Sequence, residues 1–307
     1  MSCNRKNKNV KKNYFCGKHK KLSYFEGWYF KHQKGENSIA FIPGMNIDSK
    51  GNKLAFIQVI TNDSSYNIHY LYSDFEASNT DLMIHIGNST FSSEGIHINI
   101  EEKDLKINGI IKYGELTKLD SNIMGPFSPF SAIMQCNHGI ISLFHKLTGE
   151  IVINDKVFNF DNGVGYIEKD WGSSFPKEYT WIQCNDFKNI NCSVFAAVAN
   201  IPFLGTSFKG CIAIVYYQGM EYKLCTYNGV KIIKCDKTGM ILKRGKYKLD
   251  IQISGENPQP LLAPIKGHMS INIHEHSGCK ANFRFYIDEK LEFNLETNNC
   301  NFENVNV

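Results

Sequence analysis

Carboxylic acids lie close to tryptophans in two separate segments of this 307-residue sequence. In the segment Tyr24–Lys31 (YFEGWYFK), Glu26 and Trp28 are two residues apart and share one face of an extended strand. A carboxyl group that packs against an indole, away from water, has a raised pKa and can donate a proton near neutral pH. The same spacing also suits a strand in which Trp28 fills the core and Glu26 makes a buried hydrogen bond. Both interpretations stay open from the pattern alone.

The second segment, Gly165–Pro176 (GYIEKDWGSSFP), places Glu168 and Asp170 on one strand face, just before Trp171. If both carboxyl groups point inward, burial and like-charge repulsion keep one of them protonated, which provides a general acid. If a neighbouring lysine such as Lys169 folds over them, they form a salt-bridged rim instead. The candidate general acids are therefore Glu26, Glu168 and Asp170.

A third segment, Trp181–Asn185 (WIQCN), has two chemically different faces. Trp181, Gln183 and Asn185 form one face, and the intervening isoleucine and cysteine form the other. An indole with two amides suits an amphiphilic ligand that has one polar end, provided that this face points inward. If it points outward, the amides are an ordinary solvent-exposed face.

Metal, nucleotide and serine-hydrolase chemistry have little support in the sequence. His274 and His276 lie near Cys279, but a zinc site needs three or four ligands at defined spacing, so we predict no metal site. The sequence contains neither a glycine-rich phosphate-binding loop nor a Gly-x-Ser-x-Gly motif. The ten cysteines form no Cys-x-x-Cys pair, so most are expected to be free thiols that pack as small apolar residues.

Short apolar runs of period two, separated by glycine-containing turns, predict the strands that position these residues. Two of the predicted turns are at Thr148-Gly149 and Ser277-Gly278. The pattern indicates a nearly all-β fold. Each tryptophan-bearing segment opens about half of the chain, so we predict two tandem lipocalin-like antiparallel β-barrels, at residues 23–160 and 161–307. A small barrel can hold one ligand at its mouth.

The basic charge of the chain is confined to its first residues. Eight of the 34 basic residues lie within residues 1–22, which contain no carboxylate, so the rest of the chain has 26 basic and 30 acidic residues. This argues against nucleic acid as a partner. We predict that residues 1–22 are a disordered tail that could make weak peripheral contact with an anionic membrane. No apolar stretch of signal-peptide or membrane-spanning length is present, so we expect a cytoplasmic protein.

The same segments resemble the tocopherol cyclase family. The resemblance rests on Tyr24–Lys31, Gly165–Pro176 and Trp181–Asn185, is extended by Met124–Phe127 (MGPF) and Pro260–Pro264 (PLLAP), and covers roughly residues 22–290. It implies a tandem lipocalin-like fold and, as in plant members, closure of a chromanol ring on a prenylated hydroquinone without a cofactor. An acid protonates an isoprenoid alkene, and the phenol oxygen attacks the carbocation that results.

The resemblance marks the segments, and the residue types suggest the roles within them. The acid is expected among Glu26, Glu168 and Asp170, the aromatic wall among Trp28, Tyr29, Trp171 and Trp181, and the amides that hold the phenol are Gln183 and Asn185. The expected substrate is a prenylated hydroquinone or a related isoprenoid lipid. The alternative function is a non-catalytic lipocalin-like carrier of a small apolar or amphiphilic isoprenoid.

Overall fold

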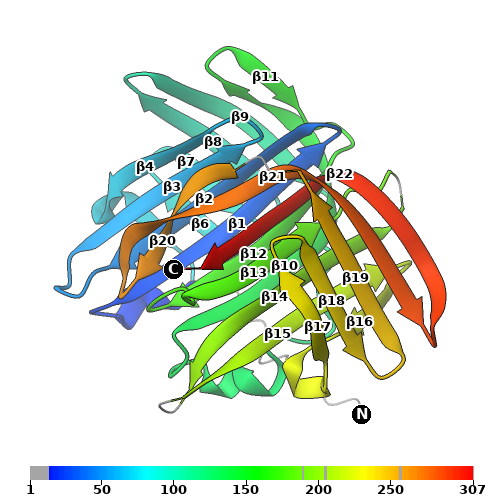
Figure 1. Cartoon of the computed structure of the whole chain (residues 1–307). Coiled ribbons are helices and arrows are strands. Elements are labelled where there is room, and N and C mark those ends of the chain that lie inside the picture. The colour runs from blue at the N-terminus through cyan, green and yellow to red at the C-terminus, as the bar shows by residue number, and fades with distance from the viewer. Residues whose placement is uncertain (1–13, 189, 204–205, 256–257, 307) are drawn as a thin grey trace, which may run out of the picture.

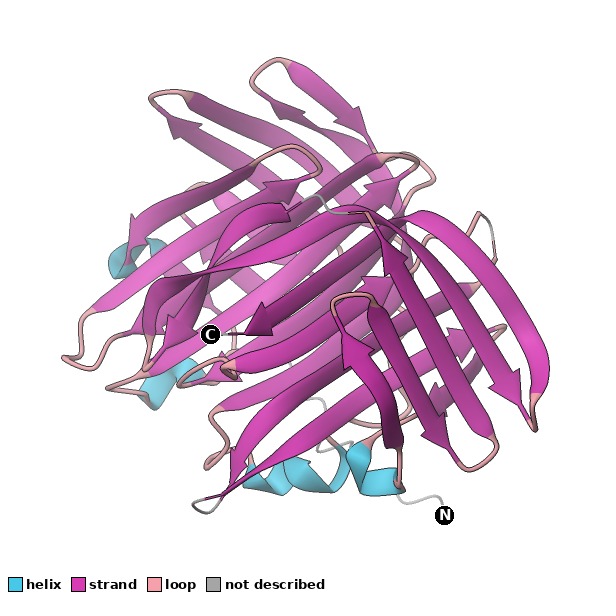
Figure 2. Ribbon diagram, in the orientation of Figure 1, coloured by secondary structure: helices cyan, strands magenta, loops and turns pink. Residues whose placement is uncertain are grey.

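The chain folds into two large antiparallel β-sheets, which Figure 1 traces along the sequence and Figure 2 by secondary structure. The computed structural model describes residues 14–188, 190–203, 206–255 and 258–306. Within these residues the first sheet has twelve strands and the second has ten. The prediction of a nearly all-β fold is confirmed.

The first sheet contains β1 (Tyr24–Lys34), β2 (Asn37–Ile47), β3 (Lys53–Thr61), β4 (Ser65–Leu71), β5 (Phe75–Ala77), β6 (Met83–Ile86), β7 (Ser89–Ser92), β8 (Gly95–Glu102), β9 (Leu105–Tyr113), β10 (Cys136–Ile153), β11 (Lys156–Asn159) and β12 (Val164–Gly172). The second sheet contains β13 (Glu178–Cys184), β14 (Cys192–Phe203), β15 (Thr206–Tyr217), β16 (Met220–Lys223), β17 (Lys231–Asp236), β18 (Gly239–Arg244), β19 (Tyr247–Ser254), β20 (Pro258–Ile265), β21 (His268–Ile287) and β22 (Lys290–Asn306). Short 3-10 helices in the described residues are η2 (Gly17–His19), η3 (Tyr72–Asp74), η4 (Gly125–Phe130) and η5 (Thr226–Asn228).

The two sheets have similar connectivity. The strand order is β4-β3-β2-β1-β12-β10-β9-β8-β7-β6-β5 in the first sheet and β16-β15-β14-β13-β22-β21-β19-β18-β17 in the second, with β11 on β10 and β20 on β21. In both, the first strand pairs with the last, β1 with β12 and β13 with β22. The outer strands β4 and β5 do not pair with each other in the described residues, so closed lipocalin-like barrels are not confirmed.

The chain passes from the first sheet to the second between Gly172 and Glu178. Strand β12 follows residue 160, where we placed the boundary between the two halves, and it is a central strand of the first sheet. The tryptophan-bearing segment Gly165–Pro176 therefore ends the first sheet, and Trp181 lies in the strand that opens the second.

Alternating strand residues separate three apolar clusters. One cluster fills the first sheet and includes Trp28, Phe30 and Trp171, and a second fills the second sheet and includes Ala196 and Phe283. The third lies between the sheets and contains residues of both, among them Tyr29, Tyr166, Trp181 and Phe195. Each sheet thus packs its own apolar cluster against one of its faces. A third cluster, with residues from both sheets, lies between them.

Strand β20 links the two sheets. It pairs with β21 on one side, and the prolines of its sequence PQPLLAPI are tolerated because it is an edge strand. The amide of Gln58 on β3 exchanges two hydrogen bonds with the backbone of Leu262, at 3.0 and 2.7 Å. The turn after β20 meets β2, where the Asn46 side chain donates to the Gly267 carbonyl at 2.8 Å. A Cβ at Gly267, whose φ is +77°, would lie 1.9 Å from the Ile47 carbonyl oxygen, so only glycine fits there.

Two long strands replace shorter predicted ones. Strand β10 runs through Thr148-Gly149 and β21 runs through Ser277-Gly278, so the turns predicted at these positions are wrong. At Gly149 a Cβ would lie 2.1 Å from the Ile110 carbonyl oxygen of β9, so the glycine permits a close backbone approach. At Gly278 the register with β22 shifts, which indicates a bulge. Glycine inside a strand was thus mistaken for glycine at a turn.

Part of the predicted disordered tail lies outside the described residues, namely residues 1–13. The part that follows is packed, which differs from the prediction. Phe15 is buried, its ring lies 5.4 Å from that of Phe75, and its backbone N–H donates to the Ser78 carbonyl at 3.0 Å. The segment Tyr14–Gly17 therefore covers one part of the first apolar cluster. No helix in the described ranges is long and apolar enough to cross a membrane.

Candidate functional site

A cavity of about 210 Å³ lies between the two sheets and is lined mainly by apolar side chains. Both sheets and the segments that connect their strands form its wall. The lining includes Phe25, Gly27, Trp28, Tyr29, Ile42, Phe56, His138, Glu168 and Asp170 from the first sheet, Tyr179, Trp181, Ala197, Ala199, Ile212, Leu261, Ile273 and Glu303 from the second, and Met124, Phe127, Met134 and Phe175 from connecting segments. A mainly apolar cavity with a few polar groups is the usual form of a small-molecule site.

The alternation of β12 delivers the acidic residues to this cavity. Glu168 and Asp170 line it, whereas Ile167 and Trp171, on the opposite face, belong to the apolar cluster of the first sheet. The prediction that the two acids share a face is therefore confirmed. Lys169 points away from them, so the salt-bridged rim considered above is not formed.

Glu168 is buried at the cavity wall, and its hydrogen bonds and nearest charged neighbour all meet one of its oxygens. Oε2 accepts hydrogen bonds from the Tyr166 hydroxyl at 2.6 Å and from the Trp181 indole N–H at 3.3 Å, and His138 Nε2 lies 3.6 Å away. In the described part of the chain Oε1 has no hydrogen-bond partner. Burial raises the pKa of Glu168 to about 7, and the charge of Asp170 acts in the same direction. Glu168 can thus be a neutral acid at neutral pH, with Oε1 free to carry the proton.

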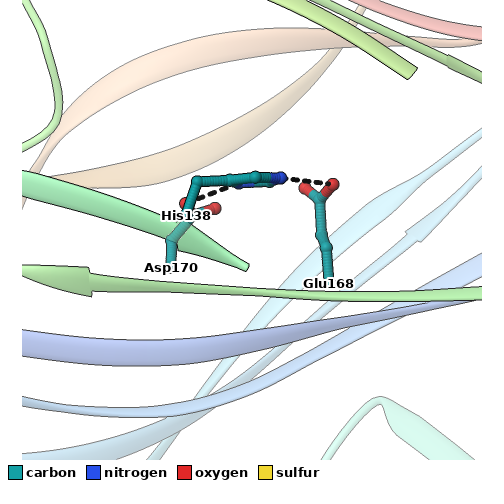
Figure 3. A group of neighbouring side chains, drawn as sticks. All are labelled: His138, Glu168 and Asp170. Carbon is teal, nitrogen blue, oxygen red and sulfur yellow. Dashed lines mark hydrogen bonds and ion pairs between the residues drawn. The ribbon is translucent and has the colours of Figure 1, made fainter. Parts of the chain in front are cut away.

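His138 lies between the two carboxyl groups (Figure 3). Its Nδ1 lies 2.9 Å from Asp170 Oδ1, and its ring stacks on Phe195 with centroids 4.7 Å apart. Cross-strand pairing of His138 on β10 with Asp170 on β12 sets this geometry. Burial lowers the pKa of His138, but the charges of Asp170 and Glu168 outweigh it and raise that pKa above its usual value.

The same three residues are the group that comes nearest to a metal site in the described residues. One potential ligand atom from each of His138, Glu168 and Asp170 lies within 4.8 Å of the others. Nδ1 of His138 is engaged by Asp170, which leaves Nε2 of His138 and the carboxylate of Glu168 as the two groups that could meet an ion, fewer than the three or four ligands of a typical zinc site. The three side chains thus form a relay with one hydrogen bond, from His138 to Asp170, and one longer ion-pair contact of 3.6 Å, from His138 to Glu168.

Glu26, the third candidate acid, lies on the other face of β1, within the first sheet. Its Oε1 is 2.6 Å from Lys169 Nζ, and both side chains are fully buried. The carboxylate also accepts hydrogen bonds from the Tyr24 hydroxyl at 2.7 Å and from the Cys16 backbone N–H at 2.9 Å. Both oxygens of Glu26 are engaged by protein groups inside the first sheet, so the geometry does not support Glu26 as a proton donor to the cavity.

The four predicted aromatic residues divide between two environments. Tyr29 and Trp181 line the cavity, and their rings make an edge-to-face contact with centroids 5.6 Å apart. Trp28 and Trp171 belong to the core of the first sheet, although Trp28 also contributes to the cavity lining. The ammonium group of Lys169 lies 5.3 Å and 4.6 Å from the ring centroids of Trp28 and Trp171, respectively. These two indoles therefore surround a structural lysine.

The two predicted amides face the first sheet, which the sequence had left open, but they hold protein groups. Gln183 accepts a hydrogen bond from the buried Lys31 Nζ at 2.9 Å. Asn185 donates to the Gly165 carbonyl at 2.8 Å. Neither lines the cavity, so they tie the sheets together and the geometry does not support their holding a phenol.

Sequence reasoning missed His138, Glu303 and Tyr179, which all line the cavity. The Tyr179 hydroxyl donates to Glu303 Oε2 at 2.6 Å, and burial raises the pKa of Glu303 well above its usual range. Behind them, the Tyr29 hydroxyl and the Asn301 amide each lie 2.6 Å from Glu275 Oε1. The alternation of residues along β22 could have predicted that Glu303 lies on a buried face of the strand. It could not have predicted that this face lines the cavity.

Comparison with known proteins tests the predicted resemblance. The model of the tocopherol cyclase-like family matches residues 104–249, a range that contains His138, Glu168, Asp170 and Trp181. The predicted resemblance to the tocopherol cyclase family is therefore confirmed over these residues, which make up a little under half of the chain. A rice protein (Oryza sativa subsp. japonica) named "Probable tocopherol cyclase, chloroplastic" is 31% identical over 119 residues, which is 38% of this chain and 23% of that protein. A maize (Zea mays) "Tocopherol cyclase, chloroplastic" is 31% identical over 86 residues, which is 27% of this chain and 18% of that protein.

The matched part of the chain thus spans less than a quarter of either plant relative. The fold has a wider likeness. A solved structure of a Nitrosomonas europaea protein described as AttH shares the fold with a TM-score of 0.54 at 12% sequence identity, over 92% of each chain.

Proposed function

We propose that the chain is a tocopherol cyclase-like enzyme in which Glu168 protonates an alkene of a prenylated hydroquinone or related isoprenoid lipid. The observation that carries this proposal is a buried carboxyl group with a pKa of about 7 at the wall of an apolar cavity. Its Oε2 is occupied by Tyr166 and Trp181, so a proton on Oε1 is directed away from them.

The proposed reaction is an isomerisation. Glu168 gives its proton to one alkene carbon, and a cation forms at the neighbouring tertiary carbon. The phenol oxygen then bonds to that carbon, and its proton passes to the Glu168 carboxylate, which restores the acid. A C–H and a C–O bond form while the alkene π bond and an O–H bond break, so the product has the mass of the substrate.

The cavity wall supplies what such a cation needs. The rings of Tyr29 and Trp181 lie beside Glu168 and present π-electron density to a positive charge. The apolar lining excludes water that would otherwise trap the cation. His138, whose ring is oriented by its hydrogen bond to Asp170, keeps a ring nitrogen 3.6 Å from Glu168 Oε2.

The lipocalin-like description of each half belongs to this proposal. It is supported by the pairing of the first and last strand in both sheets and by the apolar filling of each sheet's interior. The ligand site, however, is the space between the halves rather than the mouth of either one.

The test is incubation of the purified protein with geranylhydroquinone under reducing conditions, followed by mass spectrometry and chromatography. We expect a ring-closed isomer of equal mass from the wild type and from Glu178→Gln, which changes an exposed acid on β13. We expect none from Glu168→Gln. Tight binding without conversion by the wild type would contradict the enzyme proposal and support the alternative, a carrier of an apolar isoprenoid that the same cavity would hold.

A further inference from the structure

The cavity has a second acidic wall, on the sheet opposite Glu168. Glu303 lies on β22 directly across from Trp181 on β13 and from Glu275 on β21. It lines the cavity although only 9% of the residue is exposed. Trp181 therefore neighbours both carboxyl groups, because its indole N–H donates to Glu168 and Glu303 is its cross-strand partner.

One oxygen of Glu303 is held and the other is free. Tyr179 donates to Oε2 at 2.6 Å, and within the described ranges Oε1 has no hydrogen-bond partner. Burial and the nearby Glu275 favour the neutral form, which can both donate and accept a hydrogen bond. Because Glu303 lines the cavity, this free oxygen can meet a ligand there.

Other polar side chains of the cavity wall are already occupied. Gln58 is engaged at both ends of its amide by Leu262. The Asn137 amide donates to the Ser131 and Trp171 carbonyls. The Thr226 hydroxyl binds the backbone of Cys211. The free hydrogen-bonding capacity of the wall is thus concentrated near Glu168 on one sheet and Glu303 on the other.

The surroundings of Glu303 are aromatic. The Tyr179 ring makes an edge-to-face contact with Phe175, at 6.1 Å between centroids, and Phe175 makes another with Phe25, at 5.3 Å. All three rings line the cavity. An aromatic slot next to a neutral carboxyl group suits a hydroxylated aromatic ring, since the rings pack on its faces and the carboxyl group binds its hydroxyl.

We propose that Glu303, held by Tyr179, is a specificity-determining residue that binds a ligand hydroxyl group at the part of the cavity wall that the second sheet contributes. This inference rests on the proposed function and deepens it. In a 2-prenyl-1,4-hydroquinone, the hydroxyl next to the chain is the one that closes the ring, and the hydroxyl at position 4 is the one that Glu303 binds.

The experiment compares two probes, geranylhydroquinone and its 4-O-methyl ether, whose binding is measured by calorimetry under reducing conditions. The wild type should bind the free hydroquinone about tenfold more tightly than the ether, as expected for one hydrogen bond to a buried polar group. Glu303→Leu should lose this difference by weakening the binding of the hydroquinone alone. Glu303→Gln, whose amide also donates and accepts, should keep it.

The controls separate this inference from the proposed function. Glu296→Leu, an exposed acid on the same strand, should behave as the wild type, and circular dichroism checks that each variant is folded. If Glu303→Leu weakens both probes equally, or if Glu303→Gln loses discrimination as Glu303→Leu does, the assignment of Glu303 is wrong while the proposed function stands. If the wild type binds neither probe, both are wrong. If the wild type converts the ether as efficiently as the hydroquinone and binds both alike, the role of Glu303 is contradicted although cyclisation is confirmed.

Discussion

Lys169 and Glu26 form a fully buried ion pair with 2.6 Å between Nζ and Oε1, inside the first sheet. Lys169 also donates to the Tyr14 carbonyl at 2.6 Å, so the N-terminal segment completes the site. Glu26 is therefore a structural carboxylate, because its charge is paired with Lys169 inside the first sheet. Glu168 and Asp170, in contrast, line the cavity. The two kinds of acid sit on opposite faces of neighbouring strands.

Removing Lys169 should be strongly destabilising. Lys169→Met leaves the Glu26 carboxylate buried without its cation, and such changes cost about 3–5 kcal/mol. Urea unfolding measures the loss. The matched control is Lys243→Met, whose pair with Glu289 is exposed and spans 3.9 Å, and it should change stability by less than about 1 kcal/mol. Equal effects of the two substitutions would show that the buried pair is not needed for folding.

Glu168 should make stability depend on pH. Its pKa is raised by burial from 4.5 to about 7, so the folded state holds this proton more tightly than the unfolded state does. The stabilisation is complete below about pH 4.5 and is lost as the pH rises through about 7. Relative to Glu168→Gln, the wild type should lose on the order of 2 kcal/mol between pH 5 and pH 8, measured by urea unfolding. Parallel stability curves for the two proteins would mean that Glu168 titrates normally.

Asp170 should control the charge of His138. Burial lowers the pKa of His138, and the charge of Asp170 is the largest of the effects that raise it again. Asp170→Asn should therefore lower the pKa of His138, which NMR titration of the imidazole ring can follow. Glu178→Gln, which changes an exposed acid on β13, serves as the control. An unchanged or higher pKa in Asp170→Asn would contradict the relay drawn from the geometry.

Two adjacent alanines on β14 should respond differently to enlargement. Ala197 lines the cavity, whereas Ala196 is fully buried in the core of the second sheet. Ala197→Leu should weaken binding of geranylhydroquinone about tenfold, because it occupies ligand space, and should leave the unfolding midpoint nearly unchanged. Ala196→Leu should cost about 1–3 kcal/mol by overpacking and leave affinity intact. Calorimetry and urea unfolding on both variants test the pair, and a reversed pattern would place the ligand inside the second sheet.

Local alternation was sufficient to predict which residues share a face. It predicted the common face of Glu168 and Asp170 and that of Trp181, Gln183 and Asn185, because the side-chain period of a strand is two whatever surrounds it. It did not predict what each face meets. Gln183 faces the first sheet, as the cavity residues of β13 do, but its side-chain oxygen is bound by Lys31 Nζ and does not reach the cavity.

Contacts between distant strands account for what sequence could not predict. His138 contacts Asp170 because the two are paired between β10 and β12. Lys169 is paired with Trp28 between β12 and β1, and Glu26 lies two residues before Trp28 on the same strand. Register of this kind depends on turns and bulges along the whole chain, and two of the glycines assumed to mark turns lie inside strands. The resemblance to the family marked the segment that contains Glu168 and Asp170, and the packing of the two sheets decided that these two acids line the cavity and Glu26 does not.

The position of the cavity between the sheets means that a bound molecule is also a connector. The cavity is lined by Glu168 and Asp170 of β12, which ends the first sheet, and by residues of β13 and β22 of the second sheet. A ligand that contacts both sheets binds only when the two sheets are packed together. Its binding therefore stabilises their association, and the free energy of unfolding rises with ligand concentration. If the chain were divided between Gly172 and Glu178 into two polypeptides, neither piece would carry the site, and the ligand itself would favour their reunion.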